Sequence, residues 1–136
     1  MTESDLSKAM QRWIAKLWGP GEVFWHRVEN TAALGTFDSF VGASWGSGWL
    51  ELKICGPEAA PDMRPGQPGF GERCHRAGVL AHVLCCSDNG QMRLVDGRTT
   101  GSDWRDRLVA RGKLDSDDDV RRLLLLATSP RWAFAR

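Results

Sequence analysis

The amino-acid sequence predicts a single domain of the α/β or α+β class, built around a mixed β-sheet. The chain has 136 residues, of which 42% are hydrophobic and 26% charged, an ordinary composition for a globular protein. Helical and alternating hydropathy patterns follow one another along it, and one continuous apolar run is typical of a strand buried on both faces. A chain of this length can bury a sizeable core as one domain.

The first half of the chain combines one helical pattern with three strand patterns. Residues 3–18 carry apolar side chains at helical spacing and end at a Gly-Pro-Gly sequence. Residues 22–29 and 37–44 alternate apolar and polar side chains, and residues 48–56, GWLELKICG, do so again after the turn sequence WGSG. This order predicts a helix, a strand, a loop over 30–36 and a β-hairpin.

A second helix and a buried strand follow a Pro- and Gly-rich loop. Helical spacing resumes from about Gln67 to Ala77, with Gly78 as the expected C-cap. Residues 79–87, VLAHVLCCS, form the continuous apolar run, and a weaker strand is predicted over 91–96. Because parallel strands need a long connection, the intervening helix predicts a crossover into this buried strand.

The last third of the chain is predicted to be helical. One helix is expected to begin at Ser102, in SDWRDRLVARG, and another at Ser116. The three aspartates after Ser116 suit the positive end of a helix dipole, which explains them better than metal binding does. The expected organisation is a core of about residues 2–95 and a helical C-terminal extension of about residues 100–136.

Composition argues against membrane and secreted classes. The longest apolar run, LLLLA at 123–127, falls far short of the roughly 18–20 residues that cross a bilayer. The N-terminus lacks the basic and apolar regions of a secretory signal, so we expect a cytoplasmic protein with four reduced cysteines. No CxxC spacing occurs, and a zinc site would rest on Cys74, His75 and His82.

The net charge is +1, but clustered arginines are compatible with a basic face.

An unusual polar strand face carries the strongest functional signal. Glu51 and Lys53 share one face of the strand at 48–56, and Asp38 begins the preceding strand directly across the hairpin. Facing side chains of paired strands lie about 5 Å apart, so the three groups are expected to meet. Phosphodiester hydrolysis uses carboxylates that bind Mg²⁺ and a cation that orients water or stabilises charge. The alternative is a solvent-exposed ion pair on an edge strand.

These residues, in this element order, resemble the PD-(D/E)xK nuclease superfamily. The small stand-alone VRR-NUC-like enzymes and the archaeal-type Holliday-junction resolvases are the most similar in size and layout. The resemblance covers about residues 2–95 and implies a restriction-endonuclease-like αβββαβ core with a mixed sheet. The residues that carry it are Glu3 in TESDL, Asp38 in GTFDSF, Glu51 and Lys53 in LELK, and Gln67 in RPGQPGF.

One feature of the chain departs from the family pattern. Members commonly have a proline directly before the aspartate of the second strand, whereas Phe37 stands there in this chain. A Pro61-Asp62 pair does occur, but it follows the Glu-x-Lys segment and lies in the predicted loop. The proline is not itself a ligand, so the departure weakens the resemblance more than the mechanism that it implies.

The resemblance implies a metal-dependent DNA endonuclease, specific for branched or junction DNA and of phage or mobile-element type. If it is phage-encoded, it is expected in the cytoplasm of the host cell. Asp38 and Glu51 would bind Mg²⁺ or Mn²⁺ together with the backbone carbonyl of Leu52. Lys53 would position or activate the attacking water. Two further roles are implied: Glu3 would contact the metal through water or complete a second site, and Gln67 would orient Lys53 or the substrate.

The expected DNA-binding residues lie on several elements. Arg73 and Arg76 belong to the predicted second helix, Arg64 to the loop before it and His26 to the first strand. The arginines of the last third of the chain are also expected to flank the site and contact phosphates, which would make binding salt-dependent. The expected substrate is duplex or branched DNA.

Two functions of other classes stay open at this point. One is a non-catalytic nucleic-acid-binding module on the same fold, and the other is a protein that docks on a partner through its C-terminal helices. The last predicted helix carries an apolar stripe that Leu125 and Leu126 widen beyond a single core face. This surplus suits a homodimer, or packing under Trp132 and Phe134.

Overall fold

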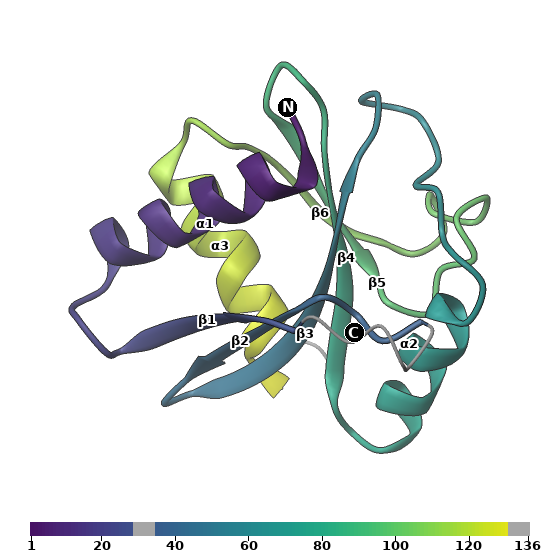
Figure 1. Ribbon diagram of the computed structural model, residues 1–136, viewed down its shortest axis with the longest axis horizontal. Coiled ribbons are helices and arrows are strands. Elements are labelled where there is room, and N and C mark those ends of the chain that lie inside the picture. Colours follow the sequence, from purple (N-terminus) through teal and green to yellow (C-terminus); the bar gives the residue numbers. More distant parts are fainter. Residues whose placement is uncertain (29–34, 131–136) are drawn as a thin grey trace.

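The computed structural model describes residues 1–28 and 35–130, in which a six-stranded sheet has helices on both faces (Figure 1). The expected loop at 30–36 lies mostly outside these residues, and so do Trp132 and Phe134. The elements in chain order are α1 (Glu3–Leu17), β1 (Val23–Arg27), β2 (Ser39–Ala43), β3 (Gly46–Ile54), α2 (Gln67–Arg76), β4 (Leu80–Cys86), β5 (Gln91–Asp96), β6 (Leu108–Lys113) and α3 (Asp117–Thr128).

The strands lie in the sheet in their chain order, β1-β2-β3-β4-β5-β6. All neighbouring strands are antiparallel except β3 and β4, which are parallel and joined by the crossover through α2. The predicted α+β class with a mixed sheet is therefore confirmed, as is the αβββαβ order up to β4. In the described residues, no helix is long and apolar enough to cross a membrane.

The prediction of a helix beginning at Ser102 is wrong. Residues 101–107 form turns, in which the Asp103 carboxylate accepts hydrogen bonds from the Thr99 hydroxyl at 2.6 Å and the Thr100 N–H at 2.9 Å. The chain then continues as β6, which pairs with the outer edge of β5. Pairing gives partners to backbone groups that would otherwise form a bare sheet edge, and this tertiary gain overrides the local helical spacing.

The final helix is confirmed. The Ser116 side chain caps α3 by accepting a hydrogen bond from the Asp119 N–H at 3.3 Å, and all three aspartates of the first turn lie at the helix N-terminus. As far as residue 130, the C-terminal extension therefore consists of turns and a strand followed by one helix, rather than of two helices.

Side chains alternate between two cores along β3. Leu50 and Leu52 face α1 and α3, where the larger apolar core lies. Glu51 and Lys53 point to the opposite face, which α2 and the turns at 101–107 cover. Apolar residues of a smaller core fill part of that second face, and they are Phe37, Val83, Cys85, Val95 and Trp104.

A glycine lets α2 approach this second face closely. An added Cβ at Gly71 would lie 1.8 Å from the carbonyl oxygen of Gly97, in the turn after β5. A larger residue would push the helix away from the sheet. Close packing of α2 brings its first residue, Gln67, over β3.

Candidate active site

Asp38 and Glu51 lie beside each other at one end of the β2–β3 pairing. Ser39 pairs with Leu50, so that the residue before Ser39 stands opposite Glu51. The backbone N–H of Asp38 donates a hydrogen bond to Glu51 Oε1 at 3.1 Å, and the Ser39 hydroxyl donates to Asp38 Oδ1 at 3.0 Å. The hairpin thus places both acids on the same side of the sheet.

Lys53 and Gln67 complete this group, which we call the acid cluster: Asp38, Glu51, Lys53 and Gln67. The Lys53 ammonium lies 3.5 Å from Glu51 Oε2. Gln67 accepts a hydrogen bond from the Arg64 N–H at 2.8 Å through Oε1, and its side chain also hydrogen-bonds the Glu51 carboxylate. Glu51, Lys53 and Gln67 are only 2%, 5% and 3% exposed, so three polar side chains are buried together.

Burial and mutual repulsion make negative charge costly in the acid cluster. Burial, followed by the charge of Asp38, raises the pKa of Glu51 to about 7, although Lys53 and the hydrogen bond from Gln67 oppose the shift. Burial also raises the pKa of Asp38, against the hydrogen bond from Ser39. The two acids together therefore favour a proton or another cation between them.

Leu52 and Glu3 also lie near Asp38. The backbone N–H of Leu52 hydrogen-bonds the Asp38 carboxylate, a contact that the sequence did not predict, while the Leu52 side chain lies in the larger core. Glu3 is partly exposed at the start of α1, and its negative charge contributes to raising the pKa of Asp38.

Among the described residues, Asp38 and Glu51 are not joined by a third potential metal-ligating side chain. Across residues 1–28 and 35–130, no three His, Cys, Asp or Glu side chains are close enough to hold a metal ion together. Glu3 therefore does not join Asp38 and Glu51 as a third grouped ligand. The same finding leaves the zinc site considered for Cys74, His75 and His82 without support.

The four expected DNA-binding residues are all exposed. Arg73 and Arg76 extend from α2, where Arg76 lies 3.8 Å from Glu72, and Arg64 lies three residues before the start of that helix. His26 on β1 pairs with Phe40, which pairs in turn with Trp49, so these three residues share the sheet face of Glu51.

The C-terminal arginines have other partners. Arg105 and Arg111 both form ion pairs with Glu58. Arg121 and Arg122 belong to α3, on the opposite face of the sheet from the acid cluster, and pair with aspartates of their own helix. The expectation that the C-terminal arginines as a group flank the site is therefore wrong for the two on α3.

A row of aromatic rings leads across the sheet to the acid cluster. Successive ring centres lie 6.1, 5.2, 5.5 and 4.9 Å apart. The row ends at the residue before Asp38, and its members in order are Phe24, Phe40, Trp49, Phe70 and Phe37. In the sequence these aromatics were signals of strands and, for Phe70, of a helix; the alternation along the strands was the one hint of a continuous row.

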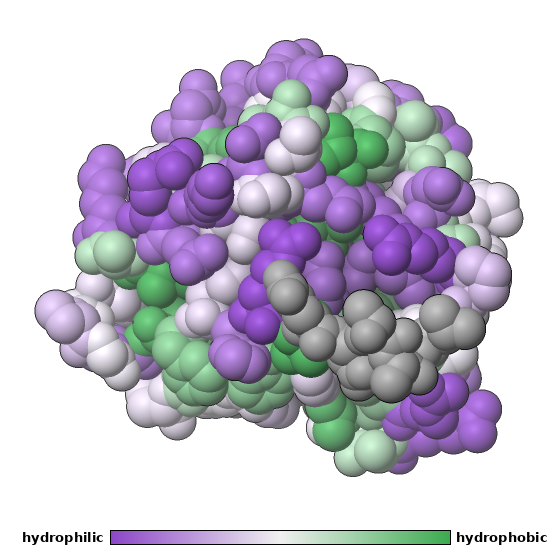
Figure 2. Space-filling view, viewed as in Figure 1, coloured by the Kyte–Doolittle hydropathy of each residue, from purple (hydrophilic) through white to green (hydrophobic). Residues whose placement is uncertain are grey.

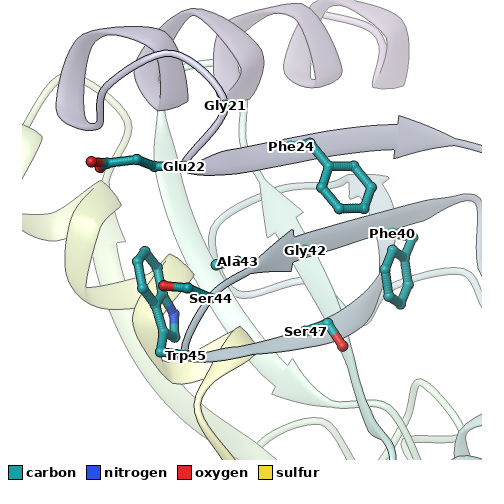
Figure 3. Close-up of a pocket in the computed structure, with 9 residues that line it drawn as sticks. All are labelled: Gly21, Glu22, Phe24, Phe40, Gly42, Ala43, Ser44, Trp45 and Ser47. Carbon is teal, nitrogen blue, oxygen red and sulfur yellow. The ribbon is translucent and has the colours of Figure 1, made fainter.

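The outer end of this row is open to solvent. Phe24 is 55% exposed and lies over Gly42, where an added Cβ would be 2.2 Å from the ring. Phe24 and Phe40 line a hollow of about 740 Å³. Figure 3 shows the two rings on neighbouring strands, with Trp45 at the hairpin turn. In Figure 2, apolar surface gathers along the lower edge of the view, over the β1–β3 part of the sheet.

Comparisons with known proteins give similarity to solved structures but to no sequence family. No protein-family profile matches the chain, and no curated protein matches it. Among solved structures the chain is similar to Hjc, a Holliday junction resolvase from the archaeal hyperthermophile Archaeoglobus fulgidus. The TM-score is 0.46 and the sequence identity 14%, over 64% of this chain and 72% of that chain. The function proposed below rests on the geometry of the site and not on this similarity.

Proposed function

We propose that this protein is a metal-dependent endonuclease that hydrolyses phosphodiester bonds in DNA at the acid cluster. The burial of two neighbouring acids with one lysine and one glutamine is the observation that carries this proposal. Removing a charged group from water costs several kcal/mol, so a fold that needed only stability would place apolar side chains there. Buried acids with a raised pKa are typical of functional sites.

The oxygen atoms of the cluster suit a hard divalent cation. Mg²⁺ is usually held by one or two carboxylates and keeps several waters, so a pair of acids is sufficient. Asp38 and Glu51 would hold Mg²⁺ or Mn²⁺, with the Leu52 carbonyl as a further oxygen and Glu3 acting through water. The chemistry that such an ion supplies is neutralisation of a phosphate oxygen and a lowered pKa of coordinated water.

The other residues of the cluster position the reacting groups. The Asp38 N–H and the Gln67 side chain hold the Glu51 carboxylate in one orientation. Lys53, 3.5 Å from the same carboxylate, is suited to orient the attacking water and to stabilise negative charge that develops on the phosphate. Gln67 acts as a positioning residue in this scheme.

The surroundings of the cluster favour branched DNA over plain duplex. Arg64, Arg73, Arg76 and His26 are exposed and available to phosphates. The aromatic row offers faces on which unpaired bases stack, as they do in proteins that bind single strands. Flaps and junctions present such bases beside duplex, so we propose a structure-specific enzyme.

A homodimer would suit the symmetric cutting of a junction. Leu125 and Leu126 remain partly exposed on α3 and line a hollow of about 360 Å³, together with Asp118, Arg121 and Arg122. An apolar face rimmed by charges of both signs is suited to a second copy of the chain. Sedimentation of the wild type and Leu125→Glu tests this, because the variant should shift a dimer to monomer.

Cleavage assays test the central proposal. Wild type is offered four-way junctions, flaps, nicked duplex, intact duplex and single strands with Mg²⁺, Mn²⁺ or EDTA. We expect cleavage of a branched form with either metal and none in EDTA. Lys53→Ala should lower the rate by on the order of 100-fold or more, because it removes a positioned charge. Exposed Lys8 on α1 gives the matched control, Lys8→Ala, which should cut at the wild-type rate.

Binding measured in EDTA separates catalysis from recognition. Lys53→Ala should bind DNA about as well as wild type, because one buried lysine is a small part of a phosphate-contacting surface. If wild type binds DNA but cuts no form with either metal, the non-catalytic binding module replaces the enzyme. If wild type cuts and Lys53→Ala cuts equally fast, the catalytic centre lies elsewhere.

A further inference from the structure

A second buried charge lies on the same face of the sheet, on β5. Arg93 is only 2% exposed, and its guanidinium carbon lies 4.2 Å from the ring centre of buried Trp104. Its Nη2 donates hydrogen bonds to the Gly56 carbonyl at 2.9 Å and to Cys55 Sγ at 3.1 Å. Arg93, Trp104 and Cys55 are called the guanidinium cluster below.

This guanidinium lacks the carboxylate that a buried arginine usually has. Within the described parts of the chain, its Nε and Nη1 have no hydrogen-bond partner. Glu58 lies near enough to feel its charge, but the Glu58 oxygens are bound by Arg105 and Arg111. An arginine cannot lose its proton in a protein, so the buried charge requires a negative partner.

Cys55 is the ionisable acceptor that touches Arg93. Its thiol lies just after β3, is partly exposed, and receives a hydrogen bond from Cys85 on β4. The charged groups around it are Arg93 on β5 and Lys53 on β3, and both favour a thiolate. The Cys85 hydrogen bond, followed by these cations, lowers the pKa of Cys55 to about 6 despite partial burial.

We propose that Cys55 is a reactive thiolate, paired with Arg93, and a site of oxidation by hydroperoxides. The Cys55 sulfur attacks one oxygen of hydrogen peroxide, so that an S–O bond forms and the O–O bond breaks. The sulfur loses two electrons, hydroxide leaves and takes a proton from solvent, and the product is a sulfenic acid. This chemistry does not depend on the nuclease function proposed above.

The other three cysteines are internal controls. Cys74, Cys85 and Cys86 are buried, and all three have a raised pKa. Burial raises the pKa of Cys86 to about 11. Protonated, buried thiols react slowly with electrophiles, because the thiolate is the nucleophile.

Alkylation of the intact folded chain tests the thiolate. Each cysteine is followed by peptide mass spectrometry after brief exposure to iodoacetamide between pH 5 and pH 9. We expect the Cys55 rate to rise with a midpoint near pH 6 and to level off by about pH 7.5, at least about tenfold above the other three cysteines at pH 7. A midpoint above pH 8 in wild type would overturn the proposal.

Trapping with dimedone tests the oxidation. After hydrogen peroxide treatment the dimedone adduct should be found on Cys55, and an adduct that is absent or spread evenly over the cysteines would contradict the proposal. Arg93→Lys should keep the low alkylation midpoint, because it keeps the charge, and Arg93→Met should raise it. Wild type alone already decides the outcome if either variant fails to fold.

Discussion

The acid cluster and the guanidinium cluster lie on one face of the same sheet, but the first buries an excess of like charge and the second a cation beside its negative partner. The acid cluster holds two carboxylates for one lysine, and burial together with repulsion raises the pKa of its acids. The guanidinium cluster holds a single cation that is stacked on Trp104 and hydrogen-bonded to Gly56 and Cys55. The first is a group of like charges held together by the fold, and the second a cation held by attractive contacts.

This difference indicates that the two clusters contribute to stability with opposite signs. Like charges held together weaken the folded state unless a cation neutralises them. A buried cation with attractive contacts supports the packing around it, and its removal leaves a cavity and an unpaired thiolate. Removing one charge from each cluster tests the comparison directly.

The largest effect is expected at Arg93. Arg93→Ala should lower the free energy of unfolding by about 3–5 kcal/mol, because it breaks a buried charge pair and leaves space beneath Trp104. Urea unfolding at pH 8 measures the loss. Arg73→Ala, at an exposed position on α2, is the control and should change stability by less than about 0.5 kcal/mol. A loss under about 1 kcal/mol at Arg93 would show that the guanidinium cluster does not support the fold.

Glu51 should behave in the opposite way. Its pKa is raised from 4.5 to about 7 in the folded chain, so folding favours the protonated form. The contribution of Glu51 to the stability of the metal-free protein is therefore fully present below about pH 4.5, and about 3 kcal/mol should be lost as the pH rises from there through about 7. Glu51→Gln removes this loss, and at pH 8 in EDTA it should be more stable than wild type.

Unfolding curves at pH 5 and pH 8, in EDTA and in Mg²⁺, measure this effect. Mg²⁺ should restore wild-type stability at pH 8 and have little effect on Glu51→Gln, because a ligand that binds only the folded state stabilises it. Asp62→Asn, at an exposed acid in the loop before α2, should follow wild type. Equal stability of wild type and Glu51→Gln at both pH values would contradict the claim that burial and repulsion make negative charge costly in the acid cluster.

The fold was predictable as far as local patterns determine it. Residues 3–18, 48–56 and 79–87 each have a clear period and end at turn residues, and the structure contains the corresponding elements α1, β3 and β4. Residues 102–112 have a serine cap and helical spacing, but become turns and β6. The unsatisfied edge of β5 decides that outcome, and no local pattern reports it.

The two clusters also differ in how far local sequence patterns determine them. Alternation along β3 and the hairpin register bring Asp38, Glu51 and Lys53 together, so the sequence predicted their meeting. Arg93 and Cys55 are 38 positions apart, and Arg93 lies on β5 whereas Cys55 directly follows β3, a strand that does not pair with β5. Their contact depends on the order of strands in the finished sheet, and neither residue belongs to a motif.

The aromatic row should strengthen binding of unpaired bases beside the acid cluster. Phe24→Ala should weaken binding to single strands and flaps by about 1–2 kcal/mol, or roughly tenfold, because stacking on an aromatic ring contributes about 1–3 kcal/mol per base. Fluorescence anisotropy in EDTA measures this loss, and intact duplex should bind as before. Val79→Ala, at an exposed apolar residue before β4, is the matched control. Equal losses for duplex and single strands would exclude stacking at Phe24.

The smallest expected effect concerns the arginines of α2. Arg73→Ala and Arg76→Ala should each flatten the dependence of log affinity on log salt by about one unit, because each lost phosphate contact releases one counterion fewer. Cleavage at saturating DNA should not change, since neither side chain belongs to the acid cluster. Arg12→Ala, at an exposed position on α1 and on the opposite face of the sheet, is the control and should keep the wild-type slope. Wild-type slopes in both α2 variants would show that DNA reaches the acid cluster without contacting α2, whereas a flattened slope in Arg12→Ala would mean that DNA also contacts the α1 side.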